Sequence, residues 1–325
     1  MRRSIVVKRI FVDGEAGTTG LQIRQRLARH EGVQLVTIPE QHRKDIAARA
    51  DAINRADLAI LCLPDDAARE AASLAKADTR VIDASSAHRT HPDWTYGFPE
   101  WKAGHASRIR EARLVTNPGC YAVASVALLH PLIAERLVPA EHPVAINAVS
   151  GYSGGGKALI DRYENPKNER HIDGAFRVYA LDLEHKHSGE IEKRSGLARP
   201  PLFVPSTARY RQGMLVEIPL LLWSLPKAVT ASQIQECLAS HYASSTFVRV
   251  APLHRSDRSV ELDAETLNGT NELQLLVFAN EARGQVALCA VLDNLGKGAA
   301  GQAVQNLNLM LGMEQTTALL ERLPS

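Results

Sequence analysis

The sequence predicts an α/β protein in which a Rossmann-type, doubly wound parallel sheet is joined to an α+β domain with a mostly antiparallel sheet. Three observations support this prediction. Residues 1–120 alternate apolar runs with helix-like segments, the middle of the chain is a series of strand-like runs, and 325 residues exceed the ~250–300 that one hydrophobic core usually holds. Alternation is typical of a parallel sheet, and runs of strands with segregated helices are typical of α+β domains.

The alternating part opens with a strand at 9–14 and a helix at 18–30, in which apolar residues recur every three or four positions. The run 57–64 is apolar almost throughout, as a parallel strand covered on both faces should be. The other elements expected here are strands at 33–38, 80–85 and 112–117 and helices at 44–56, 65–77 and 121–137.

The remainder of the chain changes character. A strand followed by a glycine-rich loop is expected at 143–154, and one helix is evident at 230–244, with Thr230 or Ser232 as its cap. An amphipathic helix is expected at 297–313. The other strand-like runs are 176–183, 201–210, 213–223, 246–253 and 272–295.

Composition excludes several classes of function. With 38 basic and 36 acidic residues the net charge is +2, which gives no case for binding nucleic acid or an anionic membrane. The four cysteines form no CxxC pair and have no zinc-ligand spacing, so we expect no metal and a reduced, intracellular protein. Lys8 and Arg9 interrupt the first apolar run, and no run approaches the ~18 residues of a membrane span, so we expect a cytoplasmic protein.

A glycine motif, Gly14-x-x-Gly17-x-x-Gly20, lies between the first strand and the first helix. Glycine suits a backbone that turns tightly and approaches a ligand, and a helix N-terminus presents N–H groups to a pyrophosphate. The first strand–helix turn of such a fold is where dinucleotides bind. The motif therefore predicts a dinucleotide site, and a tight turn without a ligand is the alternative.

The end of the second strand bears on the choice of dinucleotide. An acidic residue there binds the ribose of NAD, whereas a basic cluster suits the 2′-phosphate of NADP. Glu40 is followed closely by His42, Arg43 and Lys44, which favours NADP. The alternative is that these charges form the solvated start of a helix.

Cys120 follows Asn117-Pro118-Gly119 and precedes an apolar helix. A helix N-terminus lowers the pKa of a cysteine below its usual ~8.5 and so favours the thiolate. We therefore predict that Cys120 is a nucleophile, the alternative being a small residue needed for packing.

Two histidines, His185 and His187, precede a helix-like segment that contains Glu190. Histidine handles protons near neutral pH, as a cysteine nucleophile and its adducts require. Surface histidines and a metal site are the alternatives, although no further cluster has ligand spacing. A glycine-rich loop at 150–157, which includes Gly154 and Lys157, can present N–H groups to an anion but lacks P-loop order; a flexible connection is the alternative.

Together these residues resemble the N-acetyl-γ-glutamyl-phosphate reductases, in particular their shorter (type 2) subfamily. The segments that carry the resemblance are FVDGEAGTTGLQI, VIDASSAHR, YGFPE, NPGCYA, SGYSGGGK, EHKHSGEIE and DNLGKGAAGQAVQNLNLM, spread over nearly the whole chain. Pro205-Ser206-Thr207 departs from the Pro-His-Leu pattern of the longer enzymes.

The resemblance implies a dinucleotide-binding domain at 1–119 with 297–325 and a catalytic and oligomerisation domain at 120–296. It implies Cys120 as the nucleophile, His185 or His187 as acid/base and Glu190 as a further catalytic residue. Lys157, Arg89 and Arg209 are candidates for the substrate's phosphate or carboxylate. The residues expected at NADP are Gly14, Gly17, Thr18, Thr19, Gly20, Arg43, Ser85, Gly154, Asn294 and Lys297.

The implied reaction is NADPH-dependent reduction of N-acetyl-glutamyl 5-phosphate to the semialdehyde through a cysteine thioester, a step of arginine biosynthesis, by a homodimer or homotetramer. Three alternatives stay open. One is the same chemistry on another acyl phosphate of the aspartyl or aminoadipyl type. Another is a dinucleotide-binding sensor without turnover, and the last is a redox-sensing role for Cys120, although no resolving cysteine lies near it.

Overall fold

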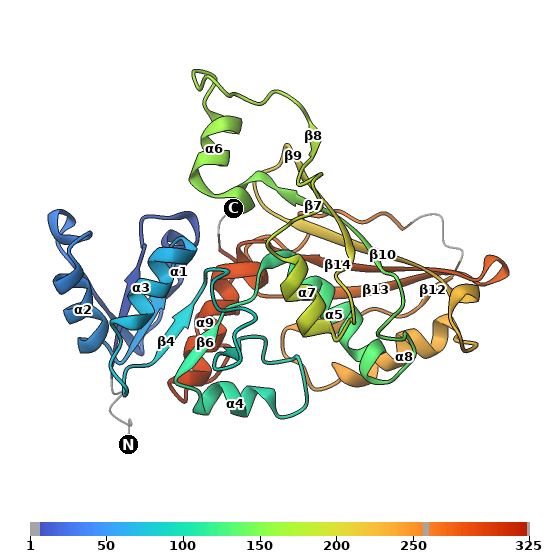
Figure 1. The fold of residues 1–325 in the computed structure, drawn as a ribbon, viewed down its shortest axis with the longest axis horizontal. Coiled ribbons are helices and arrows are strands. Elements are labelled where there is room, and N and C mark those ends of the chain that lie inside the picture. Colours follow the sequence, from blue (N-terminus) through green and yellow to red (C-terminus); the bar gives the residue numbers. More distant parts are fainter. Residues whose placement is uncertain (1–6, 256–259, 324–325) are drawn as a thin grey trace. The chain divides into compact units, whose positions relative to one another are not determined.

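The computed structural model describes residues 7–255 and 260–323. They form two compact units, which are described separately (Figure 1). The first unit holds the described residues up to Pro118 together with Ala299–Glu321, and the second holds Gly119–Gly298 and the described residues from Arg322 onward. In the described parts of the chain, no helix is long and apolar enough to cross a lipid bilayer.

The first unit contains a fully parallel sheet with the strand order β2-β1-β3-β4-β6-β5. Its order is that of a doubly wound sheet, because the chain runs from β1 outward to β2 and then returns to the other side of β1. The strands are β1 (Lys8–Asp13), β2 (Val33–Val36), β3 (Leu58–Leu61), β4 (Val81–Asp83), β5 (Thr95–Tyr96) and β6 (Leu114–Thr116).

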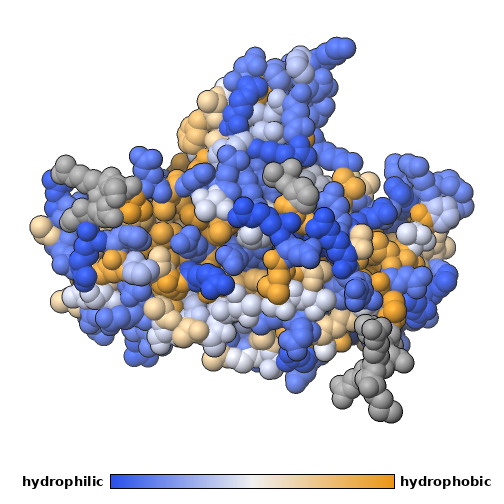
Figure 2. Space-filling model, turned by 180° about the vertical axis from the view of Figure 1, so that it is seen from behind, coloured by the Kyte–Doolittle hydropathy of each residue, from blue (hydrophilic) through white to orange (hydrophobic). Residues whose placement is uncertain are grey.

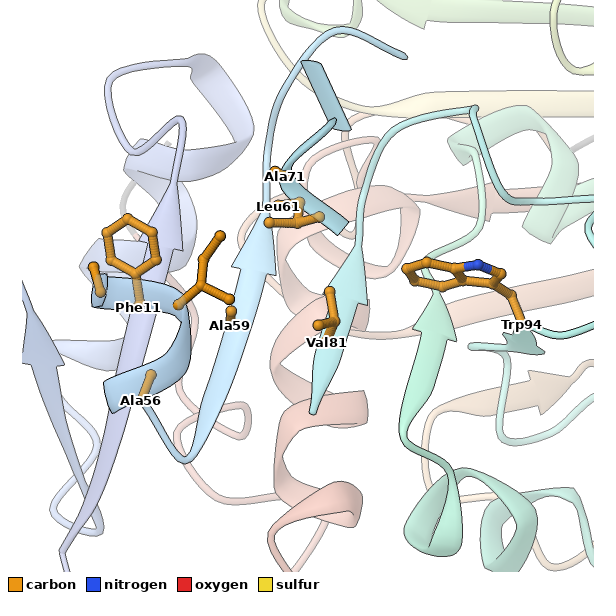
Figure 3. Packing of buried hydrophobic residues seen from close by; sticks show 9 residues of the cluster. Phe11, Ala56, Ala59, Leu61, Ala71, Val81 and Trp94 are labelled. Carbon is orange, nitrogen blue, oxygen red and sulfur yellow. The ribbon is translucent and has the colours of Figure 1, made fainter. Parts of the chain in front are cut away.

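Helices connect these strands, as the alternating pattern predicts. The elements are α1 (Thr18–Leu27), the short helix η1 (Glu40–His42), α2 (Ile46–Arg55), α3 (Asp65–Ser73) and α4 (His105–Glu111). Asp45 begins α2 by accepting the backbone N–H groups of Ala47 and Ala48. A core cluster lies between the sheet and α2 and α3, and Figure 3 labels several of its residues, namely Phe11, Ala56, Ala59, Leu61, Ala71, Val81 and Trp94.

The last helix of the first unit, α9 (Gly301–Met310), follows a π-helical turn, η5 (Gly296–Ala300), and contacts α1, α4 and β4. The expected helix is present, but all ten of its residues are buried, so it has no solvent-exposed polar face of the kind an amphipathic surface helix has. Several of its polar side chains form hydrogen bonds inside the protein: Asn306 donates to Gly97 O and Asn117 Oδ1, and Asn308 pairs with His30. Gln302 Oε1, by contrast, has no hydrogen-bond partner among the described residues. Burial costs little when polar groups keep hydrogen bonds.

The second unit contains an eight-stranded sheet with the order β11-β13-β14-β10-β7-β9-β8, and β12 pairs with β13. Its strands are β7 (Ala145–Gly151), β8 (Phe176–Val178), β9 (Leu202–Ala208), β10 (Met214–Leu221), β11 (Val248–Val250), β12 (His254–Arg255), β13 (Leu273–Asn280) and β14 (Gln285–Leu292). The adjacent strands β13, β14, β10 and β7 pair antiparallel, as expected. The sheet as a whole is mixed, because β7 and β9 are parallel, as are β11 and β12 with β13.

Helices cover one face of this sheet (Figure 1). The helix α5 (Cys120–Ala134) contacts β10, β13 and β14, and α7 (Ser188–Ser195) and α8 (Ala231–His241) pack against α5. α5 is apolar on nearly all sides because it is surrounded in this way. The other elements are α6 (Gly156–Glu164) and the short helices η2 (Tyr152–Gly155), η3 (Leu222–Ser224) and η4 (Glu281–Arg283).

Replacing Leu61, which is fully buried in β3, with Ala should lower the free energy of unfolding of the first unit by about 2–5 kcal/mol. The cost arises from lost burial and from the cavity that remains. Leu21→Ala is the matched control, because Leu21 is 43% exposed on α1 and alanine is a good helix former. Urea unfolding followed by circular dichroism measures both variants. Equal shifts of the midpoint would contradict the packing described here.

Candidate active site

Cys120 is the first residue of α5, and Gly119 is the residue that caps the helix. The first turn contains no acidic residue, and no side chain caps it. The positive end of the helix dipole therefore acts on the thiol, which favours a thiolate. The backbone of Gly298 packs closely against Cys120, since a Cβ added to Gly298 would lie 2.8 Å from Cys120 Cβ.

A carboxylate holds the backbone beside this thiol. Glu190, on α7, is only 2% exposed, and its Oε1 and Oε2 accept the Gly119 N–H at 3.0 and 3.3 Å. The start of α5 is thus tied to α7 one residue before Cys120. The observed contact of Glu190 is therefore with the backbone of Gly119, next to Cys120.

The two histidines lie around Tyr121, the residue that follows Cys120. The rings of His185 and His187 are 4.8 Å apart, and each lies 5.8 Å from the ring of Tyr121. The backbone N–H of His187 donates to Nδ1 of His185 at 3.1 Å. A neutral His185 therefore carries its proton on Nε2, which makes Nε2 the atom that can donate.

Two tyrosines complete this group, and the sequence reasoning missed both. Tyr179 donates to the Tyr121 hydroxyl at 3.2 Å, and Tyr121 donates to Ser206 O at 3.0 Å. Burial raises the pKa of Tyr121 well above its ordinary value and raises that of Tyr179 to about 12, with a smaller contribution from the nearby Cys120. Both hydroxyls are therefore neutral donors at pH 7. The position of Tyr121 next to Cys120 could have identified it from the sequence. Tyr179 gave no such indication, because it lies in the strand-like run 176–183.

The glycine motif of the first unit has the geometry of a ligand cradle. Gly14 has φ +84°, and a Cβ there would lie 2.3 Å from Cys62 O, so the backbone tolerates no side chain. Gly17 begins α1 without a side-chain cap, and the first turn of α1 has no acidic residue. Thr18 Oγ1 is buried and has no hydrogen-bond partner among the described residues. An anionic group at this helix N-terminus fits these observations.

A pocket beside the cradle contains Arg43. Its lining includes Gly14, Glu15, Thr37, Ile38 and Arg43, at the ends of β1 and β2. Arg43 forms an ion pair with Glu15 at 2.7 Å, a contact that the sequence did not suggest. The pocket lies where a Rossmann fold receives the adenosine ribose.

Ser85 follows β4 and is engaged with a buried carboxylate. Its hydroxyl donates to Asp83 Oδ2 at 2.7 Å and its N–H donates to Asp83 Oδ1 at 2.9 Å. Asp83 also contacts His88 Nδ1 at 2.7 Å. This network fixes the loop after β4 at the carboxyl end of the sheet, which is the same end as the glycine motif. Thr19 and Gly20 lie in the first turn of α1, and Gly20 packs against Gly14 O.

Three of the residues expected at the cofactor belong to the second unit. Asn294 is buried, accepts the Gly213 N–H at 2.8 Å and donates to Ser153 Oγ at 3.0 Å. Gly154 lies beside it, since an added Cβ would be 3.4 Å from Asn294 Nδ2. Lys297 is fully buried, with Nζ 5.5 Å from the ring of Phe247.

The three candidates for anion binding differ in their surroundings. Arg89 is buried in the first unit and donates to the carbonyls of Asn117 and Ala84, which joins the ends of β6 and β4. In the second unit, Arg209 donates to Asp173 O and Lys157 is exposed on α6. Among the described residues, no group of three or more His, Cys, Asp or Glu side chains is arranged to hold a metal ion.

Comparison with known proteins gives one consistent result. The family model "Semialdehyde dehydrogenase, NAD binding domain" matches residues 9–109, and "Semialdehyde dehydrogenase, dimerisation domain" matches residues 120–294. Among solved structures, a probable aspartate-semialdehyde dehydrogenase from Pseudomonas aeruginosa has a TM-score of 0.68 at 17% identity, covering 94% of this chain and 98% of that one. Aspartate semialdehyde dehydrogenase II from Vibrio cholerae has a TM-score of 0.66 at 17% identity, covering 94% and 99%. These similarities confirm the predicted fold class.

Curated relatives are much closer in sequence. N-acetyl-γ-glutamyl-phosphate reductase from Burkholderia cenocepacia is 54% identical over 93% of this chain and 97% of its own length. N-acetyl-γ-glutamyl-phosphate reductase 2 from Pseudomonas putida is 52% identical over 94% and 97%. The reductase from Brucella anthropi is 50% identical over 94% and 98%. Because these relatives are 50–54% identical to it over 93–94% of its length, this chain belongs to the N-acetyl-γ-glutamyl-phosphate reductase family.

Proposed function

We propose that this protein reduces N-acetyl-glutamyl 5-phosphate to N-acetyl-glutamate 5-semialdehyde, with NADPH as the reductant and a thioester on Cys120 as the intermediate. Membership of the reductase family supports the substrate. The observation that carries the chemistry is the placement of Cys120 at the start of α5, with Glu190 on the preceding N–H and His185 and His187 around the next residue.

The chemical sequence follows from these positions. The Cys120 thiolate attacks the acyl carbon, a C–S bond forms, and the bond to phosphate breaks. The backbone N–H groups in the first turn of α5 stabilise the oxyanion, and loss of one such donor typically costs about 10²–10³ in rate. A nicotinamide dinucleotide, when bound, supplies the hydride that reduces the thioester carbon. A histidine then donates a proton to the thiohemiacetal oxygen and takes it back as the C–S bond breaks, which releases the aldehyde.

His185 is the better candidate for this proton transfer. Its Nδ1 accepts the His187 N–H, which sets the ring orientation and leaves Nε2 as the donor atom. His185 is also the more exposed of the two residues, since it is only partly buried, whereas His187 is 4% exposed at the N-cap position of α7. Glu190 acts on this chemistry as a positioning residue, through Gly119.

We infer different roles for the two units. We assign dinucleotide binding to the first unit, with the glycine motif and Thr18 at the pyrophosphate and Arg43 at the 2′-phosphate. We assign catalysis and self-association to the second unit. Its exposed apolar side chains, Phe176, Val178, Leu181, Leu183, Leu202, Leu221 and Trp223, are between 39% and 70% exposed. Figure 2 shows apolar surface among the hydrophilic residues of one face. Exposed apolar surface of this kind, with a match to a dimerisation domain, supports a homo-oligomer.

Cys120→Ser should abolish reduction of N-acetyl-glutamyl phosphate while NADPH binding stays within about twofold, since serine lacks a comparable nucleophile at neutral pH. NADPH absorbance measures turnover, and fluorescence titration measures binding. Aspartyl phosphate runs beside the acetylated substrate as a test of specificity. Near-normal turnover by the variant would exclude the thioester, and preference for aspartyl phosphate would reassign the substrate.

Alkylation should distinguish Cys120 from the other cysteines. Burial raises the pKa of Cys62 and Cys289 to about 12 and that of Cys237 to about 11, so these thiols stay protonated at pH 7. They become thiolates only as the pH approaches those values. Iodoacetamide at pH 7 followed by peptide mass spectrometry should therefore label Cys120 first. Faster labelling of any of the other three in the folded protein would argue against an activated Cys120.

His185→Gln should reduce turnover by about 10²–10⁴-fold, the usual contribution of a general acid–base group. It should also remove one ionisation from the pH dependence of turnover. His187→Gln is the matched variant and should retain that ionisation. If the His187 variant alone loses the ionisation, the proton transfer belongs to His187.

A further inference from the structure

Glu15 lies at the centre of a group of three charges in the first unit. Its Oε1 is 2.7 Å from Nη2 of Arg43, and its Oε2 is 2.9 Å from Nη1 of Arg24. The Glu15 side chain is 15% exposed, whereas each arginine side chain is 40% exposed. The carboxylate is thus the inner member, and both guanidinium groups reach solvent.

Three separate segments supply these charges. Glu15 lies in the glycine motif between Gly14 and Gly17, Arg24 lies in the last turn of α1, and Arg43 follows η1. Glu15 and Arg43 line the same pocket at the ends of β1 and β2. A 2′-phosphate on an adenosine ribose in this pocket would meet Arg43 where Glu15 already binds it.

We propose that Glu15 is a specificity-determining residue that competes with the cofactor's 2′-phosphate for Arg43 and Arg24, and so limits the preference for NADP over NAD. This inference rests on the proposed assignment of the 2′-phosphate to Arg43. Two guanidinium groups and one carboxylate leave a net charge of +1 on the group, which attracts a phosphate of charge about −1.5 to −2 less than two unpaired arginines would.

The size of the effect follows from the ion pairs. Exposed pairs of this kind change an equilibrium by a factor of roughly 1.5 to 5 each, so releasing both arginines favours phosphate by about 2- to 30-fold. Carboxylate–phosphate repulsion acts in the same direction. Glu15 also orders the arginines, which acts in the opposite direction. Glutamine has the same length and keeps an acceptor oxygen, so Glu15→Gln removes the charge while retaining part of this order.

The test is direct binding of two ligands that lack nicotinamide, 2′-phospho-ADP-ribose and ADP-ribose, measured by isothermal titration calorimetry. Glu15→Gln should tighten binding of the phosphorylated ligand by about 2- to 30-fold and change binding of ADP-ribose less than twofold. Its affinity for the phosphorylated ligand should also fall more steeply with salt. Glu321→Gln is the control, because Glu321 pairs with Arg29 at 3.9 Å and does not line this pocket. That variant should bind both ligands as the parent protein does.

The variant Arg43→Gln tests the assignment of the 2′-phosphate to Arg43 independently of the competition by Glu15. If the parent protein prefers the phosphorylated ligand and Arg43→Gln removes the preference, the phosphate assignment stands. Unchanged or weaker binding by Glu15→Gln would then overturn the competition alone. If the parent protein shows no preference, or Arg43→Gln leaves the preference intact, the assignment of the 2′-phosphate fails and the inference fails with it.

Discussion

The candidate active site depends on one hydrogen-bonded contact, between the buried Glu190 carboxylate and the Gly119 N–H. A carboxylate that is 2% exposed is costly to bury unless it has hydrogen-bond partners. The N–H groups at a helix start also need an acceptor, because the helix provides none for them. One contact meets both requirements, and it fixes α7 against the start of α5. The two histidines precede α7 directly, so the same contact places them near Cys120.

In the first unit, a buried ion pair has a comparable role at the glycine motif. Asp13 ends β1, immediately before Gly14, and Arg49 on α2 lies 3.0 Å from its Oδ2. Both are under 8% exposed, and burial raises the pKa of Asp13 while Arg49 opposes that rise. Removing one partner of such a pair leaves an uncompensated buried charge, which is strongly destabilising. The Asp13–Arg49 pair therefore holds the turn after β1 on the side of the sheet. Gly17 and Thr18 form the side of the turn that faces the proposed ligand.

Much of the fold could be predicted because its signals are local. The apolar run at 57–64 became β3, and the apolar helix after Cys120 became α5. Predictions failed where the backbone reverses within an apolar run. The run 272–295 is a hairpin, β13 and β14, in which Gly284 has φ +59°. The run 176–183 is a strand only to Val178, since Ala180 and Leu183 have positive φ. Apolar periodicity does not report such reversals.

Other differences arise from what surrounds a segment. The glycine-rich loop continues into the short helix α6, of which only Tyr163 is buried. The sheet of the second unit is mixed because the chain passes through α6, β8 and α7 between β7 and β9, and a long crossover allows parallel pairing.

Cys120 was predictable because its evidence is its immediate neighbours. The residues that contact the neighbours of Cys120 could not be predicted, because they are distant in the sequence: Glu190 is 71 residues from Gly119, and Tyr179 is 58 residues from Tyr121. Glu15 is part of the glycine motif, but its two arginine partners come from other segments, so only the folded chain shows that a carboxylate with the same sign of charge as a phosphate occupies both guanidinium groups.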